Sequence, residues 1–340
     1  MSVTYRLGII GLGNRSCSLI RAASECGRFT IVAGSHGHAV ERPERPVHLP
    51  ESATYHTDWQ EVLASHTDAV VIATPNDTHA DIVRAAIAHG VHILCEKPLT
   101  HSIDETREIW RAVQRATTVF HVGMELRYAP AVQSLVCALE DGTLEQPQLV
   151  WAQEFRPPFR PGVREWRRSA KRTGGTFLEK NCHHFDLFAL VFGDRPVSVH
   201  AMGAPFSTIP GVVDQAMVLV RFLAGGSATL ALDMTQATQR LRLGALGRGW
   251  SFDYNSLTDT AEFQPQLPVP APPEQRWQDE GWDHPGEVQQ FQAFARRIDG
   301  EADSTADRVS PLWAHVIACA AETSLASGRV VRIDEAGHLS

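Results

Sequence analysis

The residues best suited to chemistry are a lysine that follows an apolar run and a histidine spaced between two carboxylates. Lys97 stands just beyond the apolar run 91–95. Farther along, Glu179 and His183 are four residues apart and Asp186 follows His183 by three, so on a helix their side chains share one face. A carboxylate one turn from an imidazole orients the ring and raises its basicity. This spacing predicts a general acid/base centred on His183.

Both stretches have a plainer interpretation that the local sequence leaves open. The run before Glu96-Lys97-Pro98 is typical of a short buried strand, and the proline cannot continue a β-ladder. At the carboxyl end of a strand in a parallel sheet, Lys97 would project into the ligand crevice. The alternative is a surface Glu-Lys pair in a loop. In the second stretch Lys180 and His184 form a further pair on the neighbouring helix face, and the alternative is a structural helix with incidental charges.

A strand, a glycine turn and a helix open the chain in that order. The apolar run Tyr5–Ile10 predicts a buried strand, and Gly11-Leu12-Gly13-Asn14-Arg15-Ser16 leads from it into a helical pattern. Gly11 permits a tight turn, and Gly13 lets a pyrophosphate approach backbone amides at a helix N-terminus, where the dipole favours an anion. Ser16 replaces the third glycine of the GxGxxG pattern. The arrangement predicts a dinucleotide-binding turn.

The end of the next predicted strand bears on the choice of cofactor. An NAD-binding protein would carry an acidic residue after this strand, Phe29–Gly34, to hold the adenosine ribose, but Ser35 and His36 stand there. Without that carboxylate a 2′-phosphate is not repelled, and Arg15 or Arg42 could pair with it. The sequence therefore leans to NADP over NAD.

A third strand end adds candidate cofactor residues. The run 68–74, which ends on Thr74, predicts a buried strand, and Pro75-Asn76-Asp77-Thr78-His79 follows it. Asn76 is the expected N-cap of a helix that runs to His89 and stops at Gly90. His79 in the first turns could face the crevice, although a surface histidine is the preferred interpretation.

Strands and helices continue to alternate up to about residue 123. Ser102 and Glu105 predict a capping box for a helix to about residue 116, and 118–122 is one more apolar strand. This alternation predicts a dinucleotide-binding domain over residues 1–123, built on a doubly wound parallel sheet.

Residues 124–340 predict an α+β domain with a mostly antiparallel open sheet. A helix is expected over 131–139, and 216–223 should pair with 227–234 across the glycine turn between them. Further strands are expected at 149–155, 197–202, 241–245, 250–254, 261–264 and 330–333, and further helices at 287–299 and 311–328. One face of the sheet should be left uncovered.

A basic loop separates the strand at 149–155 from the Glu179–His183 helix. Its only acid is Glu165, and it also carries Trp166. The basic residues are Arg156, Arg160, Arg164, Arg167, Arg168, Lys171 and Arg172. We interpret it as a solvated loop or a subunit contact, and it is also the best place to look for a group that binds an anionic part of a substrate.

Composition excludes several classes of protein. The 340 residues carry a formal net charge of -8, which argues against nucleic-acid binding. No run approaches the roughly 18 apolar residues of a membrane helix, and the N-terminus lacks the features of a signal peptide. The six cysteines are scattered without close pairs, which favours reduced thiols in the cytoplasm. His36 and His38 resemble a metal-binding pair, but no third ligand is evident and a solvated loop is favoured, so no metal is expected.

The order of these motifs resembles the Gfo/Idh/MocA family of NAD(P)-dependent sugar and polyol oxidoreductases. The shared features are the glycine turn, TPN..H after a strand, EKP after the next, a GxxxRYxP segment, and GG....E...H..D on a helix. The resemblance implies that Lys97 lies beside the nicotinamide and the reacting carbon, and that His183 is the acid/base. Glu179 replaces the family's usual aspartate, and Lys180 and Asn181 replace an apolar-glycine pair, so the pocket floor should differ.

The expected function is oxidation of a secondary hydroxyl of a sugar, aminosugar or cyclitol, or the reverse reduction, with Lys97, His183 and Glu179 as catalytic residues. Expected cofactor-binding residues are Gly11, Gly13, Asn14, Arg15, Ser35, His36, Thr74, Pro75, Asn76, His79, Glu96 and Lys97. Expected substrate-binding residues are Arg127, Tyr128, Trp166, Lys180, His184 and Asp186. A homodimer or homotetramer is expected. The alternatives are redox-neutral glycosidic cleavage with tightly held NAD, and a non-catalytic cofactor-sensing protein.

Overall fold

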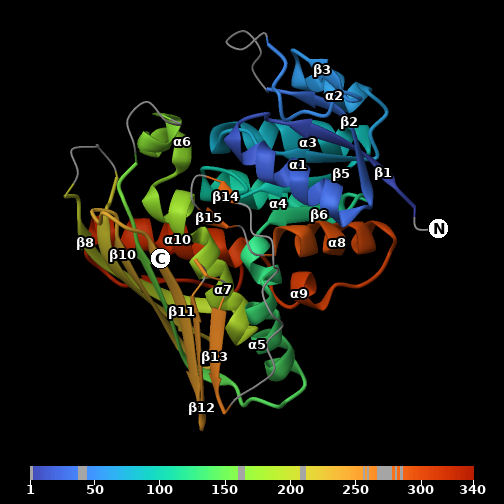
Figure 1. Ribbon diagram of the computed structural model, residues 1–340. Coiled ribbons are helices and arrows are strands. Elements are labelled where there is room, and N and C mark those ends of the chain that lie inside the picture. The colour runs from blue at the N-terminus through green and yellow to red at the C-terminus, as the bar shows by residue number, and fades with distance from the viewer. Residues whose placement is uncertain are drawn as a thin grey trace. The chain divides into compact units, whose positions relative to one another are not determined.

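The chain folds into two compact units in the computed structural model (Figure 1). The first comprises Met1–Glu125 and Trp277–Ser304, and the second comprises Leu126–Arg276 and Thr305–Ser340. The structure describes residues 3–36, 44–159, 165–206, 212–255, 257–258, 260–265, 278–279, 282–283 and 286–340.

The first unit is built on a six-stranded sheet in the order β3-β2-β1-β4-β5-β6, and each neighbouring pair of strands is parallel. The strands are β1 (Tyr5–Ile10), β2 (Phe29–Ser35), β3 (Thr54–His56), β4 (Ala69–Ile72), β5 (His92–Glu96) and β6 (Phe120–Gly123). The strand order reverses direction between β1 and β4, the place where open α/β sheets bind their ligands. The predicted doubly wound parallel sheet is confirmed.

Helices connect these strands as the alternating pattern predicts. They are α1 (Asn14–Cys26), α2 (Trp59–Ala64), α3 (His79–His89) and α4 (Ile103–Arg115), and α8 (Glu287–Ile298) joins them from far along the chain. Two short strands, β14 (Gln278–Asp279) and β15 (Trp282–Asp283), pair just before α8. The core is apolar and fully buried around Leu7, Ile9 and Leu94.

Helix α8 belongs to the first unit although it follows the second in sequence. The Phe29 ring stacks on Phe294 with centroids 5.8 Å apart and meets Phe291 edge-on at 5.7 Å. Both α8 rings are fully buried in the same core cluster. The predicted boundary at residue 123 assigned this helix to the second domain. A boundary inferred from local sequence patterns cannot show that a later segment of the chain packs back onto the first unit.

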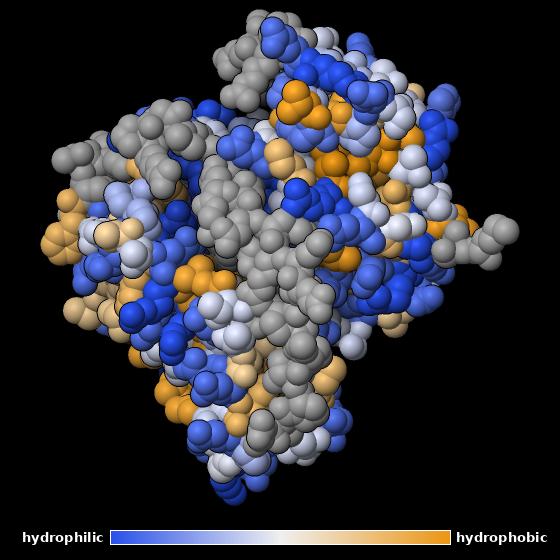
Figure 2. All heavy atoms as spheres, viewed as in Figure 1, coloured by the Kyte–Doolittle hydropathy of each residue, from blue (hydrophilic) through white to orange (hydrophobic). Residues whose placement is uncertain are grey.

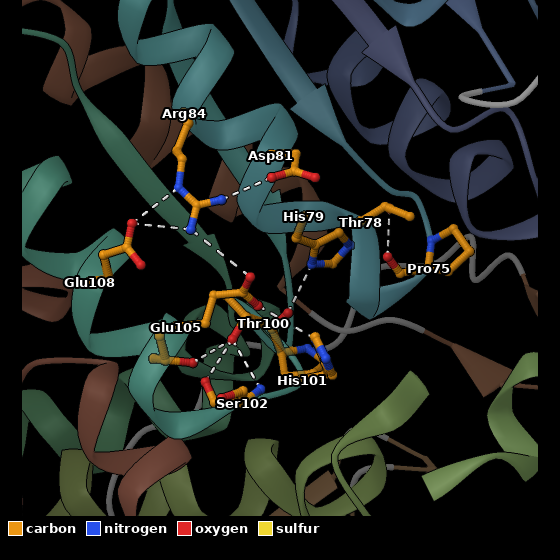
Figure 3. Close-up of polar contacts among 12 residues, drawn as sticks. Pro75, Thr78, His79, Asp81, Arg84, Thr100, His101, Ser102, Glu105 and Glu108 are labelled. Carbon is orange, nitrogen blue, oxygen red and sulfur yellow. Dashed lines mark hydrogen bonds and ion pairs between the residues drawn. The ribbon is translucent and has the colours of Figure 1, made fainter. Parts of the chain in front are cut away.

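One predicted helix start differs from the structure, and at a second, correctly predicted start the expected capping hydrogen bond is absent among the described residues. Asn76 was expected to cap the helix that ends at His89, but a 3₁₀ turn, η2 (Asn76–Thr78), comes first and α3 begins at His79. In the described residues the Ser102 side chain makes no capping hydrogen bond to α4. Instead the Thr100 hydroxyl accepts from the Ser102 amide at 3.1 Å (Figure 3). The same hydroxyl lies 2.8 Å from the Thr106 hydroxyl. Thr100 therefore organises the start that a capping box was predicted to form.

The second unit is built on an eight-stranded sheet in the order β13-β12-β11-β7-β10-β9-β8-β16. Neighbouring strands are antiparallel except β7 and β10, which run parallel, so the expected mostly antiparallel sheet is confirmed. The strands are β7 (Pro147–Phe155), β8 (Pro196–Ala204), β9 (Gln215–Phe222), β10 (Ser227–Asp233), β11 (Arg240–Gly247), β12 (Trp250–Asn255), β13 (Thr260–Gln264) and β16 (Val331–Arg332).

Helical segments accompany this sheet. They are the 3₁₀ turns η3 (Glu125–Tyr128) and η4 (Glu165–Arg168), the π-helical turn η5 (Phe177–Asn181), and the helices α5 (Pro130–Glu140), α6 (Ala170–Thr173), α7 (Cys182–Phe192), α9 (Ser304–Asp307) and α10 (Leu312–Ser327). The segment from η5 to the end of α7 is buried throughout, which fits a helix that carries functional side chains inside the fold.

One face of the large sheet is partly open to water. Along β9 buried and exposed residues alternate, as the period of a half-buried strand requires, and Met217 and Leu219 lie on the exposed side. Figure 2 shows that the side of the molecule in view carries both hydrophilic and hydrophobic residues at its surface. Within the described residues, no helix has both the length and the apolar character that crossing a membrane demands.

Candidate functional site

The glycine turn after β1 has the shape that a pyrophosphate requires. Gly11 has a φ of 105°, and a Cβ there would lie 2.5 Å from the carbonyl carbon of Ala73, so the turn accepts only glycine. Gly13 stands at the N-terminus of α1, and none of the described atoms lies within 4 Å of where its Cβ would be. An open approach to a helix N-terminus fits a bound dinucleotide phosphate.

The strand that follows holds this turn in place. The backbone amides of Gly11 and Leu12 donate to the Ser35 carbonyl at 2.8 and 3.1 Å. Ser35 is buried, while His36 is half-buried with its ring 6.1 Å from that of Tyr55. Arg42 and His38, which were considered for a 2′-phosphate and for a metal, lie outside the described residues. Among those described, no group of three or more metal-ligating side chains is present.

Three adjacent strands, β1, β4 and β5, end on candidate residues. Thr74, Pro75 and Asn76 follow β4, and Lys97 follows β5. Lys97 is half-buried, its amide donates to Glu96 Oε2 at 3.2 Å, and its peptide bond to Pro98 is cis.

His79 joins the β4 and β5 ends and is fully buried, contrary to the preferred interpretation as a surface histidine. Its Nδ1 lies 2.9 Å from the Pro98 carbonyl oxygen and its Nε2 lies 2.8 Å from the Thr74 carbonyl oxygen. Figure 3 shows the ring between the segment that begins at Pro75 and the segment around Thr100. The imidazole therefore positions the loop that carries Lys97 against the loop that carries the TPN motif.

Arg15 is held by carboxylates. Its Nε donates to Glu96 Oε1 at 2.9 Å, its Nη1 pairs with Glu287 of α8, and its Nη2 lies 3.9 Å from Glu125. Burial alone lowers the pKa of Arg15, but the carboxylates of Glu287, Glu96 and Glu125 raise it above its usual value. Three acids therefore surround this one cation, and Glu96 has a partner within the protein. Pairing of Arg15 with a 2′-phosphate stays a prediction.

The helix predicted to carry the acid/base begins with the π-helical turn η5. Gly175 has a φ of 106°, and a Cβ there would overlap Glu322 of α10. Glu322 accepts from the Phe177 amide at 3.0 Å, so it caps the start of the turn from outside. Burial raises the pKa of Glu322 to about 7, although the amides of Phe177 and Thr176 lower it. Single π-helical turns are common at functional sites because they redirect side chains.

Glu179 and His183 are both buried in this segment. Glu179 Oε1 accepts from Arg167 Nε at 2.6 Å, so a residue of the basic loop holds the carboxylate expected to orient the imidazole. Trp166, next to Arg167, lies half-buried in η4. Lys97 belongs to the first unit and His183 to the second, so their approach to one carbon stays a prediction.

A carboxylate on β7 accounts for the unusual Lys180-Asn181 pair. Glu154 Oε2 accepts from Asn181 Nδ2 at 2.7 Å and lies 3.7 Å from His184 Nδ1. Burial raises the pKa of Glu154, but the charges of Lys180, His184 and Arg156 bring it below its usual value, so the group is ionised. Of the two departures from the family motif, Asn181 thus donates to this buried anion and the charge of Lys180 stabilises it.

Arg127 and Asp186 bind each other. Asp186 accepts from Arg127 Nε at 2.6 Å and from Nη2 at 2.5 Å, and Arg127 Nη1 donates to the Val309 carbonyl at 3.1 Å. Tyr128 is also buried. This pair fastens α7 to the segment before α5, and its expected role in substrate binding stays a prediction.

Sequence reasoning missed Glu154, Glu287 and Glu322. The sequence did contain one signal for Glu154. This residue lies on the same buried face of β7 as Val150 and Ala152, and a buried charge is costly unless a partner compensates it. Glu287 and Glu322 carry no comparable local signal. Their partners lie far away in sequence, at Arg15 and Phe177.

Comparison with known proteins matches two family models. The model described as "Oxidoreductase family, NAD-binding Rossmann fold" matches residues 5–124, and the "GFO/IDH/MocA C-terminal domain" model matches residues 132–252. Together they cover more than half of the chain.

Individual relatives agree with these models. The chain is 30% identical over 179 residues to the uncharacterized oxidoreductase YrbE of Bacillus subtilis (strain 168), covering 51% of each chain. It is 34% identical over 141 residues to inositol 2-dehydrogenase of Rhizobium meliloti (strain 1021), covering 42% of this chain and 41% of that protein. The matches thus span about half of these relatives or less.

Solved structures share the fold. Levoglucosan dehydrogenase in complex with NADH and levoglucosan superposes with a TM-score of 0.81 at 19% identity, covering 98% of this chain and 100% of that one. The two family models thus agree with the glycine turn and with the residues at the strand ends. The chain belongs to the Gfo/Idh/MocA oxidoreductase family, with its NAD-binding Rossmann fold.

Proposed function

We propose that this protein transfers a hydride between NAD(P) and a secondary hydroxyl or ketone of a sugar, aminosugar or cyclitol. The observation that carries the proposal is the shared edge of β1, β4 and β5, where the glycine turn, the TPN segment and Lys97 follow three neighbouring strands of one parallel sheet. An open sheet binds its ligand at this edge, where the strand order reverses.

In this reaction the bound nicotinamide supplies the hydride acceptor, and side chains of the protein handle the proton and the charge. His183 accepts the hydroxyl proton as the carbon is oxidised. Lys97 donates a hydrogen bond to the same oxygen and stabilises its negative charge. Glu179, held by Arg167, orients the His183 ring. Gly13 and the N-terminus of α1 receive the pyrophosphate.

The cofactor is NADP or NAD. Ser35 and His36 in place of an acid at the end of β2 favour NADP, while Arg15, the candidate partner of a 2′-phosphate, already binds carboxylates. We further propose a cytoplasmic homodimer or homotetramer that uses the open face of the large sheet. Exposed Met217 and Leu219 support that choice of face.

The test is a steady-state assay of NAD+ and NADP+ reduction against a panel of cyclitols, sugars and aminosugars. The proposal expects reduced cofactor to accumulate over many turnovers with at least one compound. Glycosidic cleavage without net accumulation of reduced cofactor would indicate the redox-neutral reaction instead. A third outcome is that the protein binds the cofactor but turns over none of the compounds, and that Lys97→Met binds the cofactor as tightly as the wild type does. That outcome would indicate a sensor.

A further inference from the structure

The π-helical turn η5, which leads into the predicted acid/base helix, is held at three points by other segments. At its start Glu322 of α10 accepts from the Phe177 amide at 3.0 Å. In its middle Arg167 of η4 donates to Glu179 at 2.6 Å. At its end Asn181 donates to a buried carboxylate of β7 at 2.7 Å. All these segments belong to the second unit, so the contacts lie within one compact body.

A π-helical turn is an unusual way to begin a helix. Such turns are rare, and they close their hydrogen bonds over one residue more than α-helical turns do. Relaxation of η5 into an α-helix would shift the residues before the turn by one position relative to those after it. Glu179 lies inside the turn and His183 beyond it, so that shift would change how the carboxylate and the imidazole face each other.

Glu322 acts on the backbone of this turn. Among the described residues, the hydrogen bonds that its half-buried carboxyl accepts come from the amides of Phe177 and Thr176. Gly175 makes room for it, because a Cβ there would overlap the Glu322 carboxyl group. A carboxylate is favoured at the start of a helix, where the dipole attracts negative charge. Glu322 therefore fixes where the turn lies and supplies none of the side chains predicted to meet the substrate.

Helix α10 gives this carboxyl a firm base. Ser324, two residues after Glu322, accepts from the Ala201 amide at 2.9 Å and so ties α10 to strand β8. On the other side of the contact, the Thr176 hydroxyl accepts from the Val213 amide at 3.0 Å, just before β9. The start of η5 and the helix that holds it are thus both fastened to neighbouring strands of the large sheet.

Resting on the proposed function, we propose that Glu322 is a positioning residue for the dehydrogenase reaction. It holds the π-helical turn in the register that sets the Glu179 carboxylate and the His183 imidazole for proton transfer. It does so from a helix 145 residues away in the sequence. Loss of its hydrogen bonds slows the chemical step and leaves cofactor binding unchanged, because the glycine turn lies in the first unit.

The experiment measures kcat and NAD(P)H binding in variants of Glu322, with the compound that the wild type converts fastest. Glu322→Leu keeps much of the side-chain volume but accepts no hydrogen bond. Its kcat should fall by about 10- to 100-fold, the effect of a misplacement of about 1 Å at a reacting group. The Kd for NAD(P)H in a fluorescence titration should match that of the wild type. Glu322→Gln retains an accepting oxygen and should keep kcat near the wild-type value.

Two further variants separate positioning from stability. Val316→Ala, in the core beside Gly337, should destabilise the fold and leave kcat unchanged. Glu322→Asp keeps the charge but draws the oxygens back by one methylene, so it should lower kcat less than Glu322→Leu does, and it replaces that variant if Glu322→Leu does not fold. Wild-type kcat in the folded variant of this pair, or an equal loss of kcat in Val316→Ala, would overturn the proposal.

The proposed function and the positioning role fail differently. If the wild type turns over no compound, the dehydrogenase proposal fails, and hydrogen–deuterium exchange still tests Glu322. Amides of residues 176–183 should exchange faster in the folded Glu322 variant than in the wild type, and Val316→Ala should not show this local change. Exchange of residues 176–183 at the wild-type rate in the Glu322 variant would remove the positioning role, whatever the activity.

Discussion

Asp186 on α7 receives two parallel hydrogen bonds from the guanidinium of Arg127, and both side chains are almost completely buried. Removal of one partner leaves the other charge buried without compensation, which typically costs about 3–5 kcal/mol. We therefore expect Arg127→Met and Asp186→Asn each to lower the free energy of unfolding by about this amount, measured by urea denaturation.

The double variant Arg127→Met with Asp186→Leu separates a structural pair from a substrate contact. It should cost less than the sum of the two single variants, because no unpaired charge remains. Single variants that keep wild-type stability but raise KM would instead assign the pair to substrate binding.

His183 is the predicted acid/base. His183→Ala should depress turnover by about 10²- to 10⁴-fold, the usual contribution of general acid/base catalysis, while NAD(P)H titrations stay unchanged. His338→Ala, an exposed histidine of the C-terminal segment, serves as the control. Wild-type turnover in His183→Ala would transfer the role to His184.

Glu322 predicts a pH-dependent stability. The pKa of this carboxyl is about 7 in the folded protein and near 4.5 in the unfolded chain, so between these values the folded state binds more protons than the unfolded state. Stability should therefore fall as pH rises from 4.5 to 7, by on the order of 3 kcal/mol in total, and then stay level.

Glu322→Gln removes the ionisation and should flatten this part of the profile, measured by urea denaturation at a series of pH values. Gln retains an oxygen that can accept from the Phe177 amide, so the cap survives. The exposed Glu301→Gln should leave the wild-type slope intact. Parallel profiles for Glu322→Gln and the wild type would show that Glu322 does not titrate in this range.

Arg15 bears on cofactor selectivity. Arg15→Gln removes the cation that Glu96 and Glu287 share, so we expect the free energy of unfolding to fall by about 3–5 kcal/mol. In fluorescence titrations we expect NADH and NADPH binding to weaken by the same factor. Arg21→Gln, exposed on the same helix, is the control. A loss confined to NADPH would instead assign Arg15 as the partner of the 2′-phosphate.

Local patterns predicted much of the architecture. The run Tyr5–Ile10, the hairpin of β9 and β10, and the stop of α3 at Gly90 were correct, because each depends on neighbouring residues alone. The start of α3 was not, since η2 precedes it. Helix α4 does begin after the expected Ser102, but Thr100 forms hydrogen bonds at that start in place of the expected capping box.

Pairings across the chain escaped prediction for a physical reason. A carboxylate such as Glu287 has no distinctive local pattern, and only the folded backbone reveals that it lies beside Arg15. Lys180 and Asn181 were recognised as unusual, yet their common partner Glu154 became evident only when β7 and η5 were seen together.

The late position of α8 has a consequence for biosynthesis. The nucleotide-binding half has its sheet strands translated by residue 123, but Phe291 and Phe294, which seal its core, leave the ribosome more than a hundred residues later. Until then its apolar side is exposed in the nascent chain, where a chaperone can bind. A fragment truncated after Glu125 would lack α8, so its apolar side would stay exposed. The nucleotide-binding unit therefore cannot be isolated by one truncation of the chain.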